Sequence, residues 1–85
     1  MNEYFVTFGQ KYARETHPLL ADAHPDHWVV IEAPSLPAAR EAAYGALSDL
    51  WCDVYSPESW AEIRNLFPGG EIARLRWTPI ASSDD

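Results

Sequence analysis

The hydrophobic positions of this chain follow two different periods. Tyr4–Phe8 and Trp28–Ile31 are short runs of aromatic and β-branched residues, which are typical of β-strands. Between Ser35 and Leu50, by contrast, apolar residues recur at steps of three and four, which predicts a helix with one buried face. The residues of that face are Leu36, Ala39, Ala43, Leu47 and Leu50. Ser35 is the predicted N-cap of this helix, because its side chain can accept a hydrogen bond from a free backbone N–H.

The second half of the chain repeats the alternation of strand and helix. Trp51–Tyr55 is a predicted third strand, and Ser56-Pro57 is a cap followed by a proline at the favoured first position of a short helix. Pro68-Gly69-Gly70 ends that helix. From Glu71 to about Thr78, apolar and basic residues alternate, as in a strand with one buried and one exposed face.

These elements predict an α+β fold with the order ββαβαβ along the chain. We expect a two-layer domain in which a mixed four-stranded sheet carries both helices on one face. Residues 1–80 form this single domain, and residues 81–85 form a flexible acidic tail. Leu47, Leu75 and Trp60 are predicted core residues, since each lies on the apolar side of its element.

An uncovered sheet face follows from this arrangement. Arg74 and Arg76 point away from Leu75 and Trp77, because side chains alternate along a strand. One set of large residues from the first two strands, with Trp28 as a candidate, must share their face. Arginine and aromatic residues are enriched where proteins bind one another. Two interpretations remain open: the face binds a partner, or the loop between the first two strands covers it.

That loop, from Gln10 to His27, is the longest polar segment. It contains Lys11 and Arg14 and all three histidines, His17, His24 and His27, which are further candidate binding residues. Long connections are often functional. The histidine spacing matches no metal-binding signature, so we expect neither a metal site nor another cofactor.

No catalytic motif is present. The chain lacks a phosphate-binding loop, a dinucleotide-binding glycine pattern and a nucleophile elbow. Cys52 lies in an apolar run and is expected to be a small buried hydrophobe. We therefore expect a binding protein and not an enzyme.

Composition narrows the possible partners. The formal net charge of −7 argues against direct nucleic-acid binding, which requires a basic surface. No apolar run approaches the length of a membrane span, and no segment resembles a signal peptide. With one cysteine, no intramolecular disulfide can form, and the expected compartment is the cytoplasm.

Several segments resemble small uncharacterised proteins of actinobacterial phages, of the mycobacteriophage type. The resemblance covers about residues 3–75 and rests on Tyr4–Tyr12, the step from His24 to Val29, the helix Ala38–Ala46 and the segment Phe67–Glu71. That family has no assigned activity, so no site residue transfers. The resemblance implies a phage protein that binds and modulates a host factor. Self-association, as a homodimer for example, is a second expectation, and binding of a small anion such as a nucleotide is the alternative function.

Overall fold

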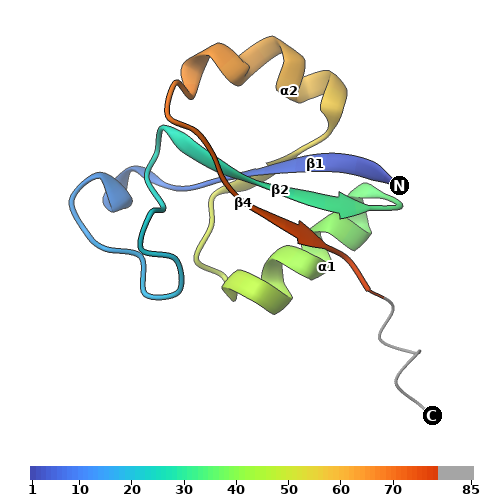
Figure 1. The fold of residues 1–85 in the computed structure, drawn as a ribbon, viewed down its shortest axis with the longest axis horizontal. Helices are drawn as coiled ribbons and strands as arrows, with labels where there is room; N and C mark the ends of the chain where they lie inside the picture. Colours follow the sequence, from blue (N-terminus) through green and yellow to red (C-terminus); the bar gives the residue numbers. More distant parts are fainter. Residues whose placement is uncertain (79–85) are drawn as a thin grey trace.

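The computed structural model of the protein describes residues 1–78, and its centre is a four-stranded mixed sheet (Figure 1). The strands are β1 (Asn2–Thr7), β2 (His27–Ala33), β3 (Asp53–Tyr55) and β4 (Gly70–Arg76), in the spatial order β3-β1-β2-β4. β1 runs antiparallel to both β2 and β3, whereas β2 and β4 are parallel. The predicted α+β class with a mixed four-stranded sheet is confirmed.

Both predicted helices form, and serine side chains cap them as expected. Helix α1 spans Leu36–Leu47, and the Ser35 hydroxyl accepts a hydrogen bond from the backbone N–H of Ala38 at 3.3 Å. Helix α2 spans Pro57–Ile63, and the Ser56 hydroxyl accepts from the backbone N–H of Ser59 at 3.3 Å. Two 3₁₀ helices, η1 (Gln10–Ala13) and η2 (Arg64–Leu66), complete the regular elements of residues 1–78.

The main core lies between α1 and one face of the sheet. Tyr4, Val6, Val29, Ile31 and Val54 point to this face, where the alanine-rich side of α1 covers them. Ala39, Ala43 and Leu47 are the buried residues of the helix. Small alanine side chains allow the helix to lie close to the sheet, as the sequence indicates.

The expectation that both helices lie on one face is wrong, because α2 covers the opposite face (Figure 1). Its Trp60 packs against Phe5 and Trp28, which alternate with the residues beneath α1. The cause is the topology. The chain crosses from β2 to β3 through α1 and then returns in the opposite direction, from β3 to β4, through α2. Two crossovers of the same hand that run in opposite directions must use opposite faces.

The ends of several elements differ from the predicted ones. Strand β3 begins at Asp53, so Cys52 precedes it and is exposed, contrary to the expected burial. Leu47 and Trp60 are buried as predicted, and Leu75 is partly buried against the core. The predicted tail, residues 81–85, lies outside the described residues. In residues 1–78, no helix has the length and apolar character that crossing a membrane requires.

Candidate functional site

A groove on the sheet face beneath α2 brings together two of the predicted site residues, Trp28 and Arg74. We call it the sheet-face groove. Its volume is about 340 Å³, and Phe5, Trp28 and Val30 form its floor. Trp60, Arg64 and Asn65 line the side formed by α2 and η2, and Glu3, Glu71 and Arg74 line the rest. The groove exists because α2 packs mainly against β1 and β3, which leaves the β2 and β4 side of this face uncovered.

An aromatic cluster builds the apolar part of the groove. The Trp60 ring stacks on Phe5 with 4.9 Å between ring centroids, and it lies 5.0 Å from Trp28 and 5.1 Å from Phe67. Tyr55 flanks it at 6.1 Å. Partial burial, together with the neighbouring Asp53 charge, raises the pKa of the Tyr55 hydroxyl, which therefore stays neutral at physiological pH. The cluster holds the short helix α2 on the sheet.

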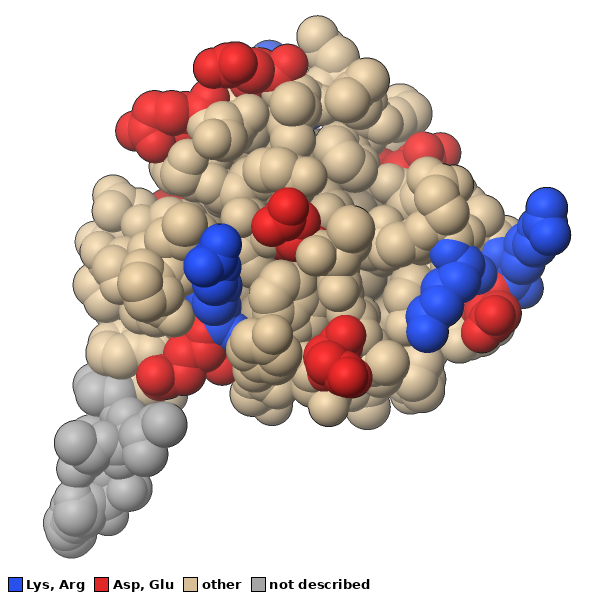
Figure 2. Space-filling model, turned by 180° about the vertical axis from the view of Figure 1, so that it is seen from behind, with Lys and Arg blue, Asp and Glu red and all other residues tan. Residues whose placement is uncertain are grey.

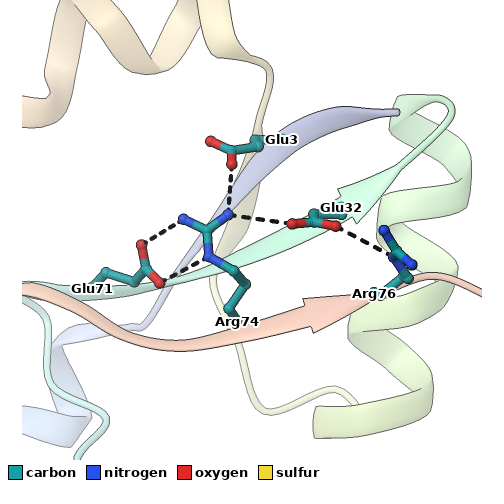
Figure 3. Close-up of polar contacts among 5 residues, drawn as sticks. All are labelled: Glu3, Glu32, Glu71, Arg74 and Arg76. Carbon is teal, nitrogen blue, oxygen red and sulfur yellow. Dashed lines mark hydrogen bonds and ion pairs between the residues drawn. The ribbon is translucent and has the colours of Figure 1, made fainter.

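The polar rim of the groove centres on Arg74, whose guanidinium lies among carboxylates from three strands (Figure 3). Its Nε and Nη2 atoms donate to the two oxygens of Glu71 at 3.2 and 3.0 Å. Its Nη1 atom donates to Glu3 at 2.5 Å and lies 3.5 Å from Glu32. These hydrogen bonds, those from Glu3 and Glu71 above all, raise the pKa of Arg74, so the residue stays cationic. Arg76 is less engaged: its Nε donates to Glu32 at 3.3 Å, and its side chain is 70% exposed.

No family model, curated protein or solved structure matches this chain. Its function must therefore be inferred from the arrangement of its own residues.

The sheet-face groove is suited to binding. It combines an aromatic floor with a rim of alternating charge, the combination that is common where proteins recognise one another. The only carboxylates in its lining, those of Glu3 and Glu71, are held by Arg74, and no cysteine, serine or histidine lines it. The lining thus contains no nucleophile paired with a base.

His17 has a structural role, which corrects its assignment to a binding surface. It is 1% exposed, and its ring packs against Phe8 and Tyr12 at centroid distances of 5.5 and 4.8 Å. Its Nδ1 accepts the backbone N–H groups of Leu19 and Leu20 at 3.0 and 3.1 Å, so the neutral ring carries its proton on Nε2. That proton is donated to the Leu50 carbonyl at 2.7 Å. His17 thereby ties the loop to the segment that follows α1.

The remaining loop residues lie around three other hollows. Arg14, His24 and His27 line a hollow of about 340 Å³ that the loop itself forms. Lys11 lies 5.2 Å above the centre of the Tyr12 ring and lines a hollow next to Cys52. Lys11 and Arg14 share the third hollow, of about 460 Å³. Both His24 and His27 bond to backbone: His24 accepts from the N–H of Asp26 at 3.1 Å, and His27 Nδ1 lies 3.2 Å from the Gly70 carbonyl. Among residues 1–78, no three metal-ligating side chains group closely enough to hold a metal ion.

The His27 ring also restricts which residue can occupy position 69, after η2. A side chain on Gly69 would lie 2.6 Å from the His27 ring and 2.8 Å from the Asp26 carbonyl. The next residue, Gly70, has a positive φ of 94°, a conformation that favours glycine. Of the glycine pair that the sequence indicates as a turn, Gly69 is thus required by the close approach of His27 and Asp26, and Gly70 is favoured by its backbone conformation.

Basic and acidic side chains of residues 1–78 lie next to one another on the surface. On the side of the molecule shown in Figure 2, basic side chains stand beside acidic ones and form no continuous basic area. On the opposite side, the arginines of β4 are paired with glutamates.

Sequence reasoning assigned Trp60 to the core alone and did not predict four other residues that line the sheet-face groove: Glu3, Arg64, Asn65 and Glu71. Glu3 carried a usable signal, because it lies in phase with Phe5 and therefore shares its face. Arg64 and Asn65 carried none, since their place depends on which face of the sheet α2 covers.

Proposed function

We propose that this protein is a small non-enzymatic interaction module that binds another protein through the sheet-face groove. The observation that carries the proposal is the groove itself, in which the aromatic residues of β1 and β2 meet the charged side chains of β4 and η2. Its volume of about 340 Å³ is enough to admit a large side chain of a partner. The resemblance to phage proteins supplies the biological context, in which the partner is a host protein whose activity the module modulates.

The overall charge favours a basic surface on that partner. The chain carries a formal net charge of −7, and complementary charge accelerates association and rejects acidic competitors. The rim already contains both signs, so a basic partner residue can pair with Glu3 or Glu71, while an acidic one can pair with Arg64.

The alternative, a small anionic ligand such as a nucleotide, has the right residue types in the same groove. Trp28 and Trp60 could stack on a base, and Arg64 and Arg74 could bind phosphate. The Arg74 guanidinium is engaged with three carboxylates, however, and an anion would have to displace at least one of them. That cost favours the protein partner.

An affinity capture with one groove variant and one matched control tests the proposal. The tagged full chain, Arg64→Glu and Arg40→Glu are each used to capture proteins from a bacterial host lysate, and the captured proteins are quantified by mass spectrometry. Both substitutions reverse the charge of an exposed arginine, but Arg64 lines the groove and Arg40 lies on α1, away from it.

We expect a protein that is captured by the wild type and by Arg40→Glu and is depleted about tenfold or more with Arg64→Glu, which corresponds to roughly 1.4 kcal/mol. Equal capture by all three chains would contradict the groove as the binding surface. A parallel calorimetric titration with ATP separates the two functions, because binding of ATP that Arg64→Glu abolishes would favour the nucleotide and not the protein.

A further inference from the structure

The free edge of β4 exposes backbone groups for hydrogen bonding. β4 is the last strand of the sheet and pairs only with β2. The backbone N–H of Trp77 donates to the Glu32 carbonyl at 2.8 Å, so the backbone of Trp77 faces β2. Because the backbone groups of successive strand residues point alternately to the two sides, Leu75 also faces β2, while Arg74 and Arg76 present their N–H and C=O groups to the open edge.

A second groove runs beside this edge, on the α1 face of the sheet. We call it the edge groove. Its volume is about 320 Å³, and Ala42, Gly45 and Ala46 of α1 form one wall while Leu75 and Trp77 form the other. The remaining lining residues are polar or charged: Glu41, Arg76 and Thr78. The Trp77 indole N–H donates to the Glu41 carboxylate at 3.0 Å, which fixes the indole in that wall. The groove exists because α1 packs mainly against β2, β3 and β1, and because Ala42, Gly45 and Ala46 on the side of α1 nearest β4 are small.

We infer that an extended peptide segment of a partner binds here by adding a fifth strand next to β4. Along such a strand, alternate side chains point to the two faces of the sheet. Those on the α1 face enter the edge groove, whose lining is mainly apolar, so they are large and apolar. Those on the other face meet Arg76, whose terminal guanidinium nitrogens have no partner among residues 1–78. Those side chains are acidic. The recognised segment therefore alternates apolar and acidic residues.

A second copy of the chain fits this edge poorly. Antiparallel pairing of two β4 strands around Leu75 would set Arg74 of one copy opposite Arg76 of the other, and like charges at directly opposed positions are destabilising. Arg76, which contacts Glu32 through its Nε alone, attracts an acidic strand from a different protein.

Fluorescence anisotropy with a labelled heptapeptide, TVEFEVT, tests the inference on the full chain. Its control, TVKFKVT, keeps the apolar residues and reverses the charge. Two pairs of protein variants separate the contribution of the edge groove from that of the free backbone edge of β4. Gly45→Leu fills the edge groove and Gly45→Ala does not, and a side chain at Gly45 meets no atom within 4 Å. Arg76→Pro removes the outward N–H, whereas Arg76→Ala removes only the side chain.

We expect saturable binding of TVEFEVT, with TVKFKVT at least about tenfold weaker. Gly45→Leu and Arg76→Pro should each weaken binding of the peptide about tenfold or more, and Gly45→Ala should leave it unchanged. The affinity of Arg76→Ala for the peptide should lie between those of Arg76→Pro and the wild type. Failure of TVEFEVT to bind, or equal affinity of the wild type and the Gly45→Leu and Arg76→Pro variants, would overturn the inference. So would a dimer in sedimentation velocity that Arg76→Pro converts to a monomer, since a second copy would then occupy the edge. The peptide assay is independent of the sheet-face groove, so either surface can fail without the other.

Discussion

Truncation of Trp60 is the most informative perturbation of this fold, because one side chain holds α2 on the sheet. Trp60 is 5% exposed and contacts Phe5, Trp28, Tyr55 and Phe67. Replacing a buried tryptophan by alanine costs roughly 3–5 kcal/mol. A chain of this size has a total stability of roughly 4–13 kcal/mol, so Trp60→Ala should remove at least about a quarter of it. Helix α2 has 7 residues, too few to persist without tertiary contacts.

A urea melt followed by circular dichroism measures the loss, and the near-ultraviolet spectrum reports whether the remaining aromatic residues stay packed. Leu66→Ala is the control, because Leu66 is 71% exposed and follows the same helix. Its effect should stay within about 0.5 kcal/mol. If Trp60→Ala loses less than about 1 kcal/mol and keeps the near-ultraviolet signal, the aromatic cluster does not hold α2, and the sheet-face groove loses its wall.

Four other predictions concern the core, the loop and the rim. Leu47→Ala should cost roughly 2–5 kcal/mol in a denaturant melt, because Leu47, on the buried face of α1, is only 4% exposed; a loss below about 0.5 kcal/mol would contradict the packing of α1 on the sheet. His17→Phe should cost about 1–3 kcal/mol, since the Leu50 carbonyl and two loop N–H groups would lose their partner; unchanged stability would show that water replaces the imidazole. Calorimetric titration with zinc should reveal no tight site, and a one-to-one site of submicromolar affinity that His24→Ala abolishes would refute this. Arg74→Ala should destabilise the fold at low salt, because Glu3, Glu32 and Glu71 would lose their shared counter-charge, and the difference from wild type should shrink as sodium chloride is raised; a salt-independent difference would point to lost packing instead.

The glutamates that pair with Arg74 also affect how a charge reversal in β4 must be interpreted. From the sequence alone, Arg74 and Arg76 are exposed residues whose reversal to glutamate abolishes binding and leaves the fold intact. In the structure, glutamate at position 74 would join three carboxylates. Loss of binding by that variant could then reflect loss of stability. Arg64 is the better probe of the same groove, because no residue among 1–78 pairs with its side chain.

Local patterns were sufficient to predict the elements and two residues of the sheet-face groove, Trp28 and Arg74. The three- and four-residue spacing from Leu36 to Leu47, the serine caps and the alternation along β4 each depend on neighbours in the sequence, and each is confirmed. Arg74, Arg76 and Trp28 do share a sheet face, as alternation and pairing register require. The strand order β3-β1-β2-β4 depends on long-range pairing, which no local pattern encodes.

The wrong predictions, for α2 and for His17, also arise from long-range contacts. Once β3 and β4 lie at opposite edges of the sheet, the second crossover must return across it, and α2 is placed on the face that we expected to be open. His17 was unpredictable for a similar reason. Its partner, the Leu50 carbonyl, lies 33 residues away, so the sequence shows only a polar residue in a polar loop.

The most direct test of the central claim is site-specific photocrosslinking. A photoreactive benzoylphenylalanine replaces Asn65, which lines the sheet-face groove on an exposed 3₁₀ turn, or Arg40, which is equally exposed on α1. Both chains are irradiated in the same host lysate, and the crosslinked products are identified by mass spectrometry. We predict one dominant protein adduct from position 65 that is absent from position 40 and is suppressed by Arg64→Glu. The same adducts from both positions, or none from position 65, would contradict a partner-binding groove.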